Sequence, residues 1–479
     1  MDAAPPPHPY GVEPSGNAFA RGESVAAWRR GLGKIGAFDD ATILSLLGWL
    51  DAPALCAVCV ASSASRAFAS FEDLWRNVAL CRFGARGEAM TYRNCWKETV
   101  VGARRRDVAA RRVYSDALYH PHRLAHATPL AGSTGLGGCA RRRPGALTMR
   151  EFVDEFERPG LPVVLEGAAA DVAARDTWDR DVLLARFGAR RFHVGGYACA
   201  LEDFLGYAAA NVDDTPLYLF DKRFAEAAPE LGAEYEVPEY FRDDLFALTE
   251  PRPDWRWLIV GGARSGSAWH IDPNGSSAWN ATLRGRKRWL FFPPRTTPPG
   301  VRPSADGLDL VAPLSIMEWV TAFYKEARAH PHFVEAHSGP GDVVFVPRGW
   351  WHCVVNQDDF TVAVTQNFVS PRGLYATLDL LRFRPHLVSG LVRDERVDEC
   401  DDLDEMRKRA VVGTALHDRL VSALRRQRPD VLSAAETELA RPKTLWARLT
   451  APAADATAAP LAKRARTTTT TGFAFDFGS

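Results

Sequence analysis

WHIDP, residues 269–273, is the stretch around which this chain is organised, and a later stretch, WWH at residues 350–352, complements it. Residues two apart on an extended segment point to the same face of a sheet, so the side chains of His270 and Asp272 converge. The proline that follows them has no N–H to donate and is typical of a strand end, where the mouth of a barrel would lie. If His352 folds back to the same point, two imidazoles and one carboxylate meet there.

This combination of side chains indicates a particular metal. Two imidazoles and one carboxylate on one face of an octahedral ion form the facial triad of non-haem Fe(II) oxygenases, which leaves positions free for an oxidant and a co-substrate. His352 follows an apolar segment, Asp342 to Pro347, so it is also expected near a strand end. An isolated H-x-D motif arises easily by chance, and the interpretation therefore depends on its surroundings.

The segment from about residue 148 to residue 372 predicts a mainly β domain. After a helix at 149–156, short strand-like runs alternate with Gly- and Pro-containing turns, which is typical of a barrel or sandwich. A short apolar strand is expected at Leu161–Leu165. The clearest strands are expected at Trp255–Val260, Ala278–Leu283, Trp289–Phe292, Asp342–Pro347 and Phe360–Val369.

Several of these strands carry polar residues on one face. Alternation places Asn280 opposite its apolar neighbours, and it places Thr365 and Asn367 together on one face. Lys287, in a turn between two strands, offers a compact cation to a carboxylate inside a barrel, and Ser267 adds a hydroxyl at the mouth. A plain barrel is filled by apolar side chains, so a polar interior suits one that holds a charged ligand such as a keto-acid.

At this point the chain resembles a known family. Residues 269–289 (WHIDPNGSSAWNATLRGRKRW) and 341–368 (GDVVFVPRGWWHCVV…TQNF) are similar to the Jumonji-C family. Residues 217–221 (LYLFD) and 237–246 (VPEYFRDDLF) resemble one branch of it, the lysyl hydroxylase also described as an arginine demethylase. The resemblance covers about residues 148–372.

The resemblance implies a fold, a set of cofactors and a reaction. The fold is a double-stranded β-helix of the cupin or jelly-roll type, and the enzyme uses Fe(II), 2-oxoglutarate and O₂. Iron is held by His270, Asp272 and His352. The implied 2-oxoglutarate site comprises Ser267, Asn280, Lys287, Thr365 and Tyr218, with Asn367 on the same polar face. The implied reaction is hydroxylation of lysine, demethylation of methyl-arginine or methyl-lysine, or both, in a basic RNA-associated or chromatin protein.

Residues 35–100 predict a helical domain in front of the β domain. Leucines recur at helical spacing from Ile43, and Pro53 separates two such runs. Over residues 35–80 the pattern resembles an F-box, with Leu55 to Cys59 and Asp73 to Trp75 as its central and closing elements. A generic three-helix module is the alternative. The F-box resemblance implies a Skp-type adaptor as a partner, and a second function: a substrate adaptor of a cullin-RING ubiquitin ligase whose Jumonji domain recognises the target.

The remaining segments are interpreted from composition. Residues 1–34, rich in Pro, Gly and Ala, and the Ala-, Pro- and Thr-rich tail 444–479 are expected to be disordered. Residues 101–147 predict an arginine-rich linker, and 373–443 predict C-terminal helices. Arginine runs can touch RNA, DNA or acidic protein, but no aromatic residues interleave them as a stacking platform requires. Solvated linker is the preferred interpretation, and direct nucleic-acid binding stays open. The basic stretch PLAKRAR at 460–466 is consistent with nuclear import, so we expect the nucleus, and also the cytoplasm.

The whole-chain numbers exclude several classes. Net charge is zero over 479 residues, so no global field favours nucleic acid. No apolar run is long enough to cross a membrane, and Met1 to Tyr10 lacks the apolar core of a secretory leader. Eight scattered cysteines are therefore expected to be reduced thiols.

Three weaker signals have structural explanations. The pair Cys56 and Cys59 has zinc or redox spacing, but no second pair accompanies it, so core packing is preferred. His330, His332 and His337 cluster with Glu335, which permits a second metal, although a surface loop is the expected placement. Cys353, next to a proposed ligand, is expected to pack on the apolar face of the barrel.

Overall fold

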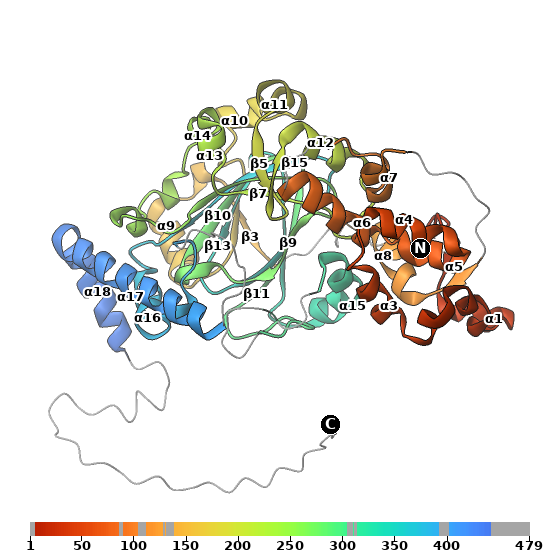
Figure 1. Ribbon diagram of the computed structural model, residues 1–479. Coiled ribbons are helices and arrows are strands. Elements are labelled where there is room, and N and C mark those ends of the chain that lie inside the picture. The colour runs from red at the N-terminus through yellow and green to blue at the C-terminus, as the bar shows by residue number, and fades with distance from the viewer. Residues whose placement is uncertain are drawn as a thin grey trace, which may run out of the picture.

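The structure is a computed structural model, and two regions of helices flank a central pair of β-sheets in it (Figure 1). None of the helices described is both long and apolar enough to span a membrane. The residues that the structure describes are 5–85, 90–103, 112–127, 130, 138–303, 310, 314–391 and 402–441.

The N-terminal region is helical, as the sequence predicts. Its helices are α3 (Asp40–Leu47), α4 (Ala52–Ala61), α5 (Ser63–Ala69), α6 (Glu72–Ala79) and α7 (Trp96–Val101). Capping side chains start three of them: Asp39, Asp51 and Ser62 each accept a hydrogen bond from the backbone N–H three residues later. Phe68 and Trp75 are fully buried at the centre of this bundle.

The extreme N-terminus is ordered where we expected disorder. Residues 5–34 contain β1 (Val12–Glu13), α1 (Ser15–Arg21) and α2 (Val25–Arg29). Val12 pairs in parallel with Val113 of β2 (Val113–Tyr114), and only 2% of its surface is exposed. The prediction was wrong because a composition rich in Pro, Gly and Ala does not reveal that one strand-forming valine has a partner a hundred residues away.

The expected linker at residues 101–147 also contributes to the fold. Its described residues include β2, helix α8 (Asp116–Ala127) and strand β3 (Ala140–Arg142). Arg141 of β3 pairs with Glu166 and Asp342, so this arginine is engaged in ion pairs and the solvated-linker interpretation is wrong for it. The arginine run at Arg104 to Arg106 and the tail at 444–479 lie outside the described residues.

Two facing sheets form the centre of the molecule. The larger has nine strands in the order β3-β4-β13-β10-β15-β8-β7-β5-β6, and the smaller has the order β12-β11-β14-β9. The larger sheet adds β4 (Val163–Leu165), β5 (Arg191–Val194), β6 (Tyr197–Ala200), β7 (Leu219–Asp221), β8 (Arg256–Gly261), β10 (Ser277–Arg284), β13 (Val343–Val346) and β15 (Thr361–Phe368) to β3. The smaller contains β9 (Gly266–His270), β11 (Lys287–Phe292), β12 (Val334–Ser338) and β14 (Trp351–Asn356). This is the jelly-roll core that the sequence predicts.

Helices cover the outer faces of both sheets. On the larger sheet, Trp279 of β10 points outward and stacks on Phe241 at a ring-centroid distance of 6.1 Å. On the smaller sheet, Trp269 of β9 packs against Trp319 of α15 (Ile316–Ala329) at 4.8 Å. The three C-terminal helices, expected from the sequence, form their own apolar cluster: α16 (Leu374–Phe383), α17 (Asp402–Gln427) and α18 (Pro429–Ala440).

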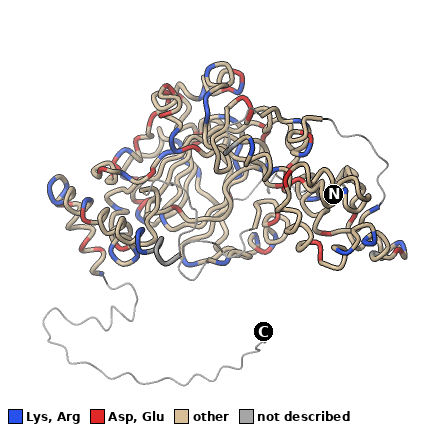
Figure 2. Tube along the Cα trace, viewed as in Figure 1, with Lys and Arg blue, Asp and Glu red and all other residues tan. Residues whose placement is uncertain are grey.

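The inner faces of the two sheets are partly polar. Asn280, one residue after Trp279, points inward, and so does Thr282, whose hydroxyl is 2.8 Å from that of Ser338 on the smaller sheet. Lysine, arginine and the acids otherwise lie mixed over helices and loops, while most of the strand residues are uncharged (Figure 2). A charged side chain inside the barrel therefore requires an explanation.

Candidate metal and co-substrate site

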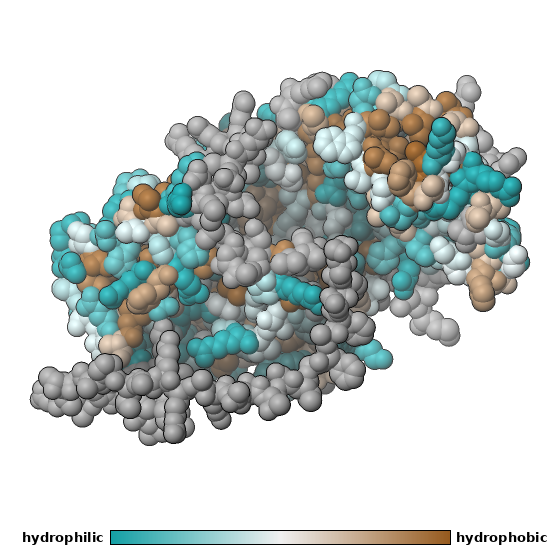
Figure 3. Space-filling model, turned by 60° about the horizontal axis from the view of Figure 1, so that its bottom comes forward, coloured by the Kyte–Doolittle hydropathy of each residue, from teal (hydrophilic) through white to brown (hydrophobic). Residues whose placement is uncertain are grey.

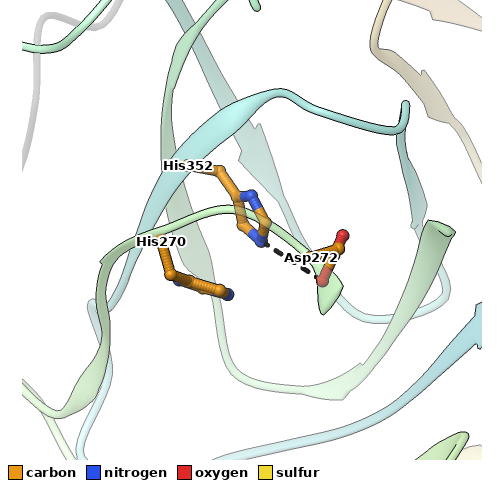
Figure 4. A group of neighbouring side chains, drawn as sticks. All are labelled: His270, Asp272 and His352. Carbon is orange, nitrogen blue, oxygen red and sulfur yellow. Dashed lines mark ion pairs between the residues drawn. The ribbon is translucent and has the colours of Figure 1, made fainter. Parts of the chain in front are cut away.

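The three predicted metal ligands meet at one point between the sheets. His270 ends β9, Asp272 follows two residues later, and His352 is the second residue of β14. Strands β9 and β14 are antiparallel neighbours in which His270 stands directly opposite His352. The potential ligand atoms of all three residues lie within 4.8 Å of one another, and among the described residues no other group of three His, Cys, Asp or Glu side chains has such geometry. Figure 4 shows the two rings and the carboxylate turned toward one another.

Backbone carbonyls orient both imidazoles. Nδ1 of His270 is 2.7 Å from the carbonyl oxygen of Ala268, and Nδ1 of His352 is 3.1 Å from that of Trp350. Each carbonyl can only accept, so each ring donates from Nδ1 and keeps the Nε2 lone pair free. Metal-binding histidines are commonly held in this way, because the second hydrogen bond fixes tautomer and ring orientation.

The Asp272 carboxylate is short of partners. Oδ1 is 4.0 Å from Nε2 of His352, and Oδ2 is buried without a hydrogen-bond partner in the described part of the chain. Burial raises the pKa of Asp272, and burial also holds the pKa of His352 well below its usual range, so this imidazole is neutral. A divalent cation binds through neutral imidazoles, and it would supply the positive charge that the buried carboxylate lacks. The donor set therefore fits Fe(II).

Lys287 is a buried cation without a described anionic partner. It is the first residue of β11 and is 1% exposed. Its ammonium donates to the hydroxyl of Tyr218 at 3.0 Å and to Oδ1 of Asn356 at 2.9 Å, and both groups are neutral. Burial alone lowers the pKa of Lys287 to about 7. A carboxylate of a ligand would supply the missing negative charge, so this end of the barrel fits 2-oxoglutarate.

The other predicted co-substrate residues line the same interior. Asn280 and Thr365 stand opposite each other on β10 and β15, and Oδ1 of Asn280 is buried without a described partner. The Thr365 hydroxyl donates to the carbonyl of Trp279 at 2.8 Å. Asn367 donates to the hydroxyl of Ser276 at 2.9 Å and lies beside the Asp272 carboxylate. The structure thus places Asn280, Thr365 and Asn367 on one inner face of the larger sheet, with Asn367 next to Asp272.

Ser267 lies on the smaller sheet, opposite Val354 of β14. Its hydroxyl makes no hydrogen bond to another described residue, so it is available to a ligand.

Two residues that sequence reasoning missed complete the part of the site around Lys287. The amide of Asn356 accepts from Lys287 and donates to the hydroxyl of Ser265 at 2.9 Å. Gly261 makes room beside them, since a Cβ there would lie 2.7 Å from the Tyr218 ring. Period-two alternation from His352 would have placed Asn356 on the inner face of β14. The pairing with Ser265 has no comparable signal in the sequence.

The weaker sequence signals resolve as packing. Glu335 was expected in a surface loop, but it lies on β12. Its Oε1 accepts a hydrogen bond from Nε of Arg288 at 2.7 Å. Both side chains are almost fully buried, so Glu335 neutralises an arginine. Cys353 is buried in the apolar cluster under α15, as predicted. Cys59 is buried in the helical domain and, like the other described cysteines, is a free thiol.

Comparison with known proteins agrees with this geometry. The model of the cupin-like domain family matches residues 199–372. The chain is 36% identical over 414 residues to the arginine-specific demethylase JMJ22 of Arabidopsis thaliana, a match that covers 83% of this chain and 81% of the relative. It is 34% identical to the lysine-specific demethylase JMJ21 of the same plant, over 73% of this chain and 38% of the relative. It is 39% identical to the bifunctional arginine demethylase and lysyl-hydroxylase psr-1 of Caenorhabditis elegans, over 48% of this chain and 60% of the relative. The chain belongs to the Jumonji-C family of Fe(II)- and 2-oxoglutarate-dependent oxygenases.

Proposed function

We propose that this oxygenase acts on basic side chains of proteins, by hydroxylating lysine, by demethylating methyl-arginine or methyl-lysine, or by both. The observation that carries the proposal is the single interior that contains the His270, Asp272 and His352 ligand set and the buried Lys287. The substrate class rests on the relatives, which are named as arginine demethylases, a lysine demethylase and a lysyl hydroxylase.

The protein's own part is to bind and orient. His270, Asp272 and His352 hold Fe(II), and Lys287 with Tyr218 holds the far carboxylate of 2-oxoglutarate. Asn280, Thr365 and Ser267 contribute polar contacts along the co-substrate, and the apolar residues between the sheets exclude water. Bound iron and 2-oxoglutarate together supply the oxidising power that inserts an oxygen atom of O₂ into a C–H bond.

The same chemistry accounts for both outcomes. Oxygen inserted into a C–H bond at a lysine side-chain carbon that is not bonded to nitrogen leaves a stable alcohol. Oxygen inserted into an N-methyl group leaves a carbon bonded to both nitrogen and oxygen, which collapses with release of formaldehyde. Placement of the substrate carbon therefore decides the product.

The test is conversion of 2-oxoglutarate to succinate together with mass spectrometry of candidate basic proteins. Hydroxylation adds about 16 mass units and demethylation removes about 14, as expected for one oxygen and one CH₂ respectively. The Asp272→Ala variant is the matched negative control, because it removes a ligand from the site. Succinate formation without either mass change, across lysine- and methyl-arginine-containing proteins, would contradict the proposed substrate class.

We also propose a protein partner on the N-terminal helical domain, a Skp-type adaptor. Hydrophobic side chains gather on the surface of this domain (Figure 3). Leu46 of α3 is 48% exposed, Trp49 just after this helix is 88% exposed, and Val60 of α4 is 78% exposed. Leu55 and Leu74 are buried, so their substitution would unfold the domain. The informative variant is therefore Trp49→Ser with Val60→Ser: it should abolish co-purification of the adaptor, and an unchanged yield would remove this partner.

We propose the nucleus as the main location. The basic stretch at 460–466, which supports this, lies outside the described residues. Deletion of 460–466 should move a fluorescent fusion of the full chain out of the nucleus. A fusion that is cytoplasmic before deletion would contradict the proposal.

A further inference from the structure

A row of three aromatic side chains extends from the co-substrate site toward solvent. The ring centroids of Tyr218 and Phe220 are 6.2 Å apart, and those of Phe220 and Trp257 are 5.7 Å apart with an interplanar angle of 29°. Tyr218 also contacts Lys287, through its hydroxyl and through its ring. We refer to Tyr218, Phe220 and Trp257 as the aromatic wall.

Strand register places this wall on the same face as the metal ligands. Trp257 of β8 stands opposite Thr365 of β15, and residues that stand opposite each other share a face. Asn367, two residues after Thr365 and therefore on that face, lies beside Asp272. Phe220 of β7 stands opposite Ile259, which is two residues from Trp257. The wall thus lines the interior that contains the Fe(II) and 2-oxoglutarate sites.

Exposure increases along the wall. Lys287 is 1% exposed at its inner end, whereas Phe220 is 39% exposed although its strand neighbours Leu219 and Asp221 are buried on the other face. Strand β9 is the edge of the smaller sheet, and Ile271, which follows the first metal ligand, is also 39% exposed. The inner face of the larger sheet is therefore open to solvent at Phe220.

No described cation occupies the outer part of the wall. The cation–π contacts of the neighbouring residues use other rings: Lys287 lies over Tyr218, and Arg252 and Arg256 lie over Trp255. Among the described residues, no arginine or lysine lies over the ring of Phe220 or of Trp257. An exposed phenylalanine beside a part-exposed tryptophan is a strong attractor for a guanidinium or ammonium group.

We propose that Phe220 and Trp257 form a platform that binds the cationic head of the substrate side chain and so determines specificity for lysine and arginine. The inference rests on the proposed function and extends it by assigning the residues that recognise the charge. Strand register places these rings on the face that lines the interior of the metal ligands, so a cation bound over them lies at the open part of that interior. The negative face of each ring attracts the cation, while the flat rings accept both planar guanidinium and tetrahedral ammonium.

The test compares binding of three peptides to the full chain loaded with Fe(II) and 2-oxoglutarate under anaerobic conditions, where no turnover occurs. Each is a fluorescently labelled Gly/Ser peptide with one central residue: lysine, arginine or the uncharged norleucine. The variants are Phe220→Leu and Trp257→Leu, which keep apolar bulk but remove the π face, and Trp257→Phe, which restores a ring. Phe19→Leu on α1, where Phe19 is 90% exposed, is the matched control.

The expected result is selective loss of the cationic peptides. Each leucine variant should weaken binding of the lysine and arginine peptides by about 5- to 30-fold and change norleucine binding little. Trp257→Phe should recover most of the loss, Phe19→Leu should bind as the parent does, and 2-oxoglutarate affinity should be unchanged in all four. Unchanged 2-oxoglutarate affinity also reports that a variant has folded.

Three outcomes would contradict the proposed platform. Equal weakening of all three peptides would make the wall a plain apolar surface, and no weakening would leave it without a role in substrate binding. Failure of the proposed function is measured separately, by mass spectrometry of candidate proteins. Peptide binding can be measured even if the protein modifies neither lysine nor methyl-arginine in them. If the parent protein binds the norleucine peptide as tightly as the lysine peptide, the proposed platform is wrong, even if the protein forms succinate.

Discussion

His270 and His352 stand directly opposite each other on β9 and β14, with ring centroids 4.0 Å apart and each Nδ1 held by the carbonyl two residues earlier in the chain. The β-ladder therefore orients the two imidazoles before any ligand arrives. Asp272, just beyond the end of β9, completes the set. Because the ladder supplies this preorganisation, little conformational entropy remains to be lost when a metal binds.

Metal binding should stabilise the protein through these three residues. At a free metal concentration of about 100 times Kd, Fe(II) or Mn(II) is expected to add about 2.7 kcal/mol to the free energy of unfolding, measured as a rise in Tm under anaerobic conditions. His352→Ala and Asp272→Ala should show no rise and no succinate formation. His330→Ala, which changes a histidine outside the site, should behave as the parent does. A metal-dependent rise in Tm that survives in Asp272→Ala would contradict the site.

Affinity for 2-oxoglutarate should fall as pH rises above 7. Burial lowers the pKa of Lys287 to about 7 in the free protein, so the lysine is charged below that pH and loses its proton above it. A bound carboxylate favours the charged form, so binding above pH 7 requires uptake of a proton. The apparent affinity should drop about tenfold from pH 7.5 to pH 8.5. Calorimetry in buffers of different ionisation enthalpy measures both the affinity and the proton uptake; a flat profile without proton uptake would refute this.

Lys287→Met should separate co-substrate binding from metal binding. Removal of one partner of a buried charge pair costs about 2–5 kcal/mol, so the KM for 2-oxoglutarate should rise about 30-fold or more. The metal-dependent rise in Tm should remain. Lys222→Met is the matched control, because Lys222 forms a part-exposed ion pair with Asp254 at 2.8 Å and should leave KM unchanged. A KM for Lys287→Met within threefold of the parent would exclude this lysine from the co-substrate site.

The buried pair of Arg288 and Glu335 should be structural. Glu335→Ala leaves an almost fully buried guanidinium without its carboxylate and should lower the free energy of unfolding by about 3–5 kcal/mol. Urea unfolding measures this, and Asp243→Ala, which breaks an exposed pair with Arg428, should cost less than about 1 kcal/mol. The double variant Arg288→Met with Glu335→Leu should regain most of the loss. Equal effects of the two alanine variants would contradict the assignment.

The two domains should unfold together through Trp96 and Asp213. The indole N–H of Trp96 on α7 donates to Oδ2 of Asp213 at 2.9 Å, and the Tyr207 hydroxyl donates to the same oxygen at 2.6 Å. Trp96→Phe removes one donor from a buried carboxylate and should cost about 1–3 kcal/mol. Trp49→Phe, at a position that is 88% exposed, should be neutral. Calorimetry should record one unfolding transition for the parent protein. Two transitions, of which only one moves to a lower temperature in Trp96→Phe, would show that the domains unfold independently.

The sequence by itself determined the chemistry of the site and the type of fold. His270, Asp272, His352 and Lys287 are recognisable because each chemical role permits few residue types and because strand alternation assigns each to a face. The same alternation separated Asn280 from Trp279, and Thr365 from its apolar neighbours. Local periodicity also identified the N- and C-terminal helices. These features depend on residues close in the chain, where backbone geometry alone relates one side chain to the next.

Only the tertiary structure decided which distant residues meet. The N-terminus was expected to be disordered, but Val12 has a strand partner in Val113. Glu335 was considered beside three histidines, but it faces Arg288 on the neighbouring strand. Asn356 and Phe220 acquire their roles from the register of their strands with β11 and β8. The residue pattern within one strand cannot specify this register. Pairing between strands is set by the packing of the whole core. The neighbours of a buried charge or of a solvent-exposed aromatic ring are therefore visible only in the folded chain.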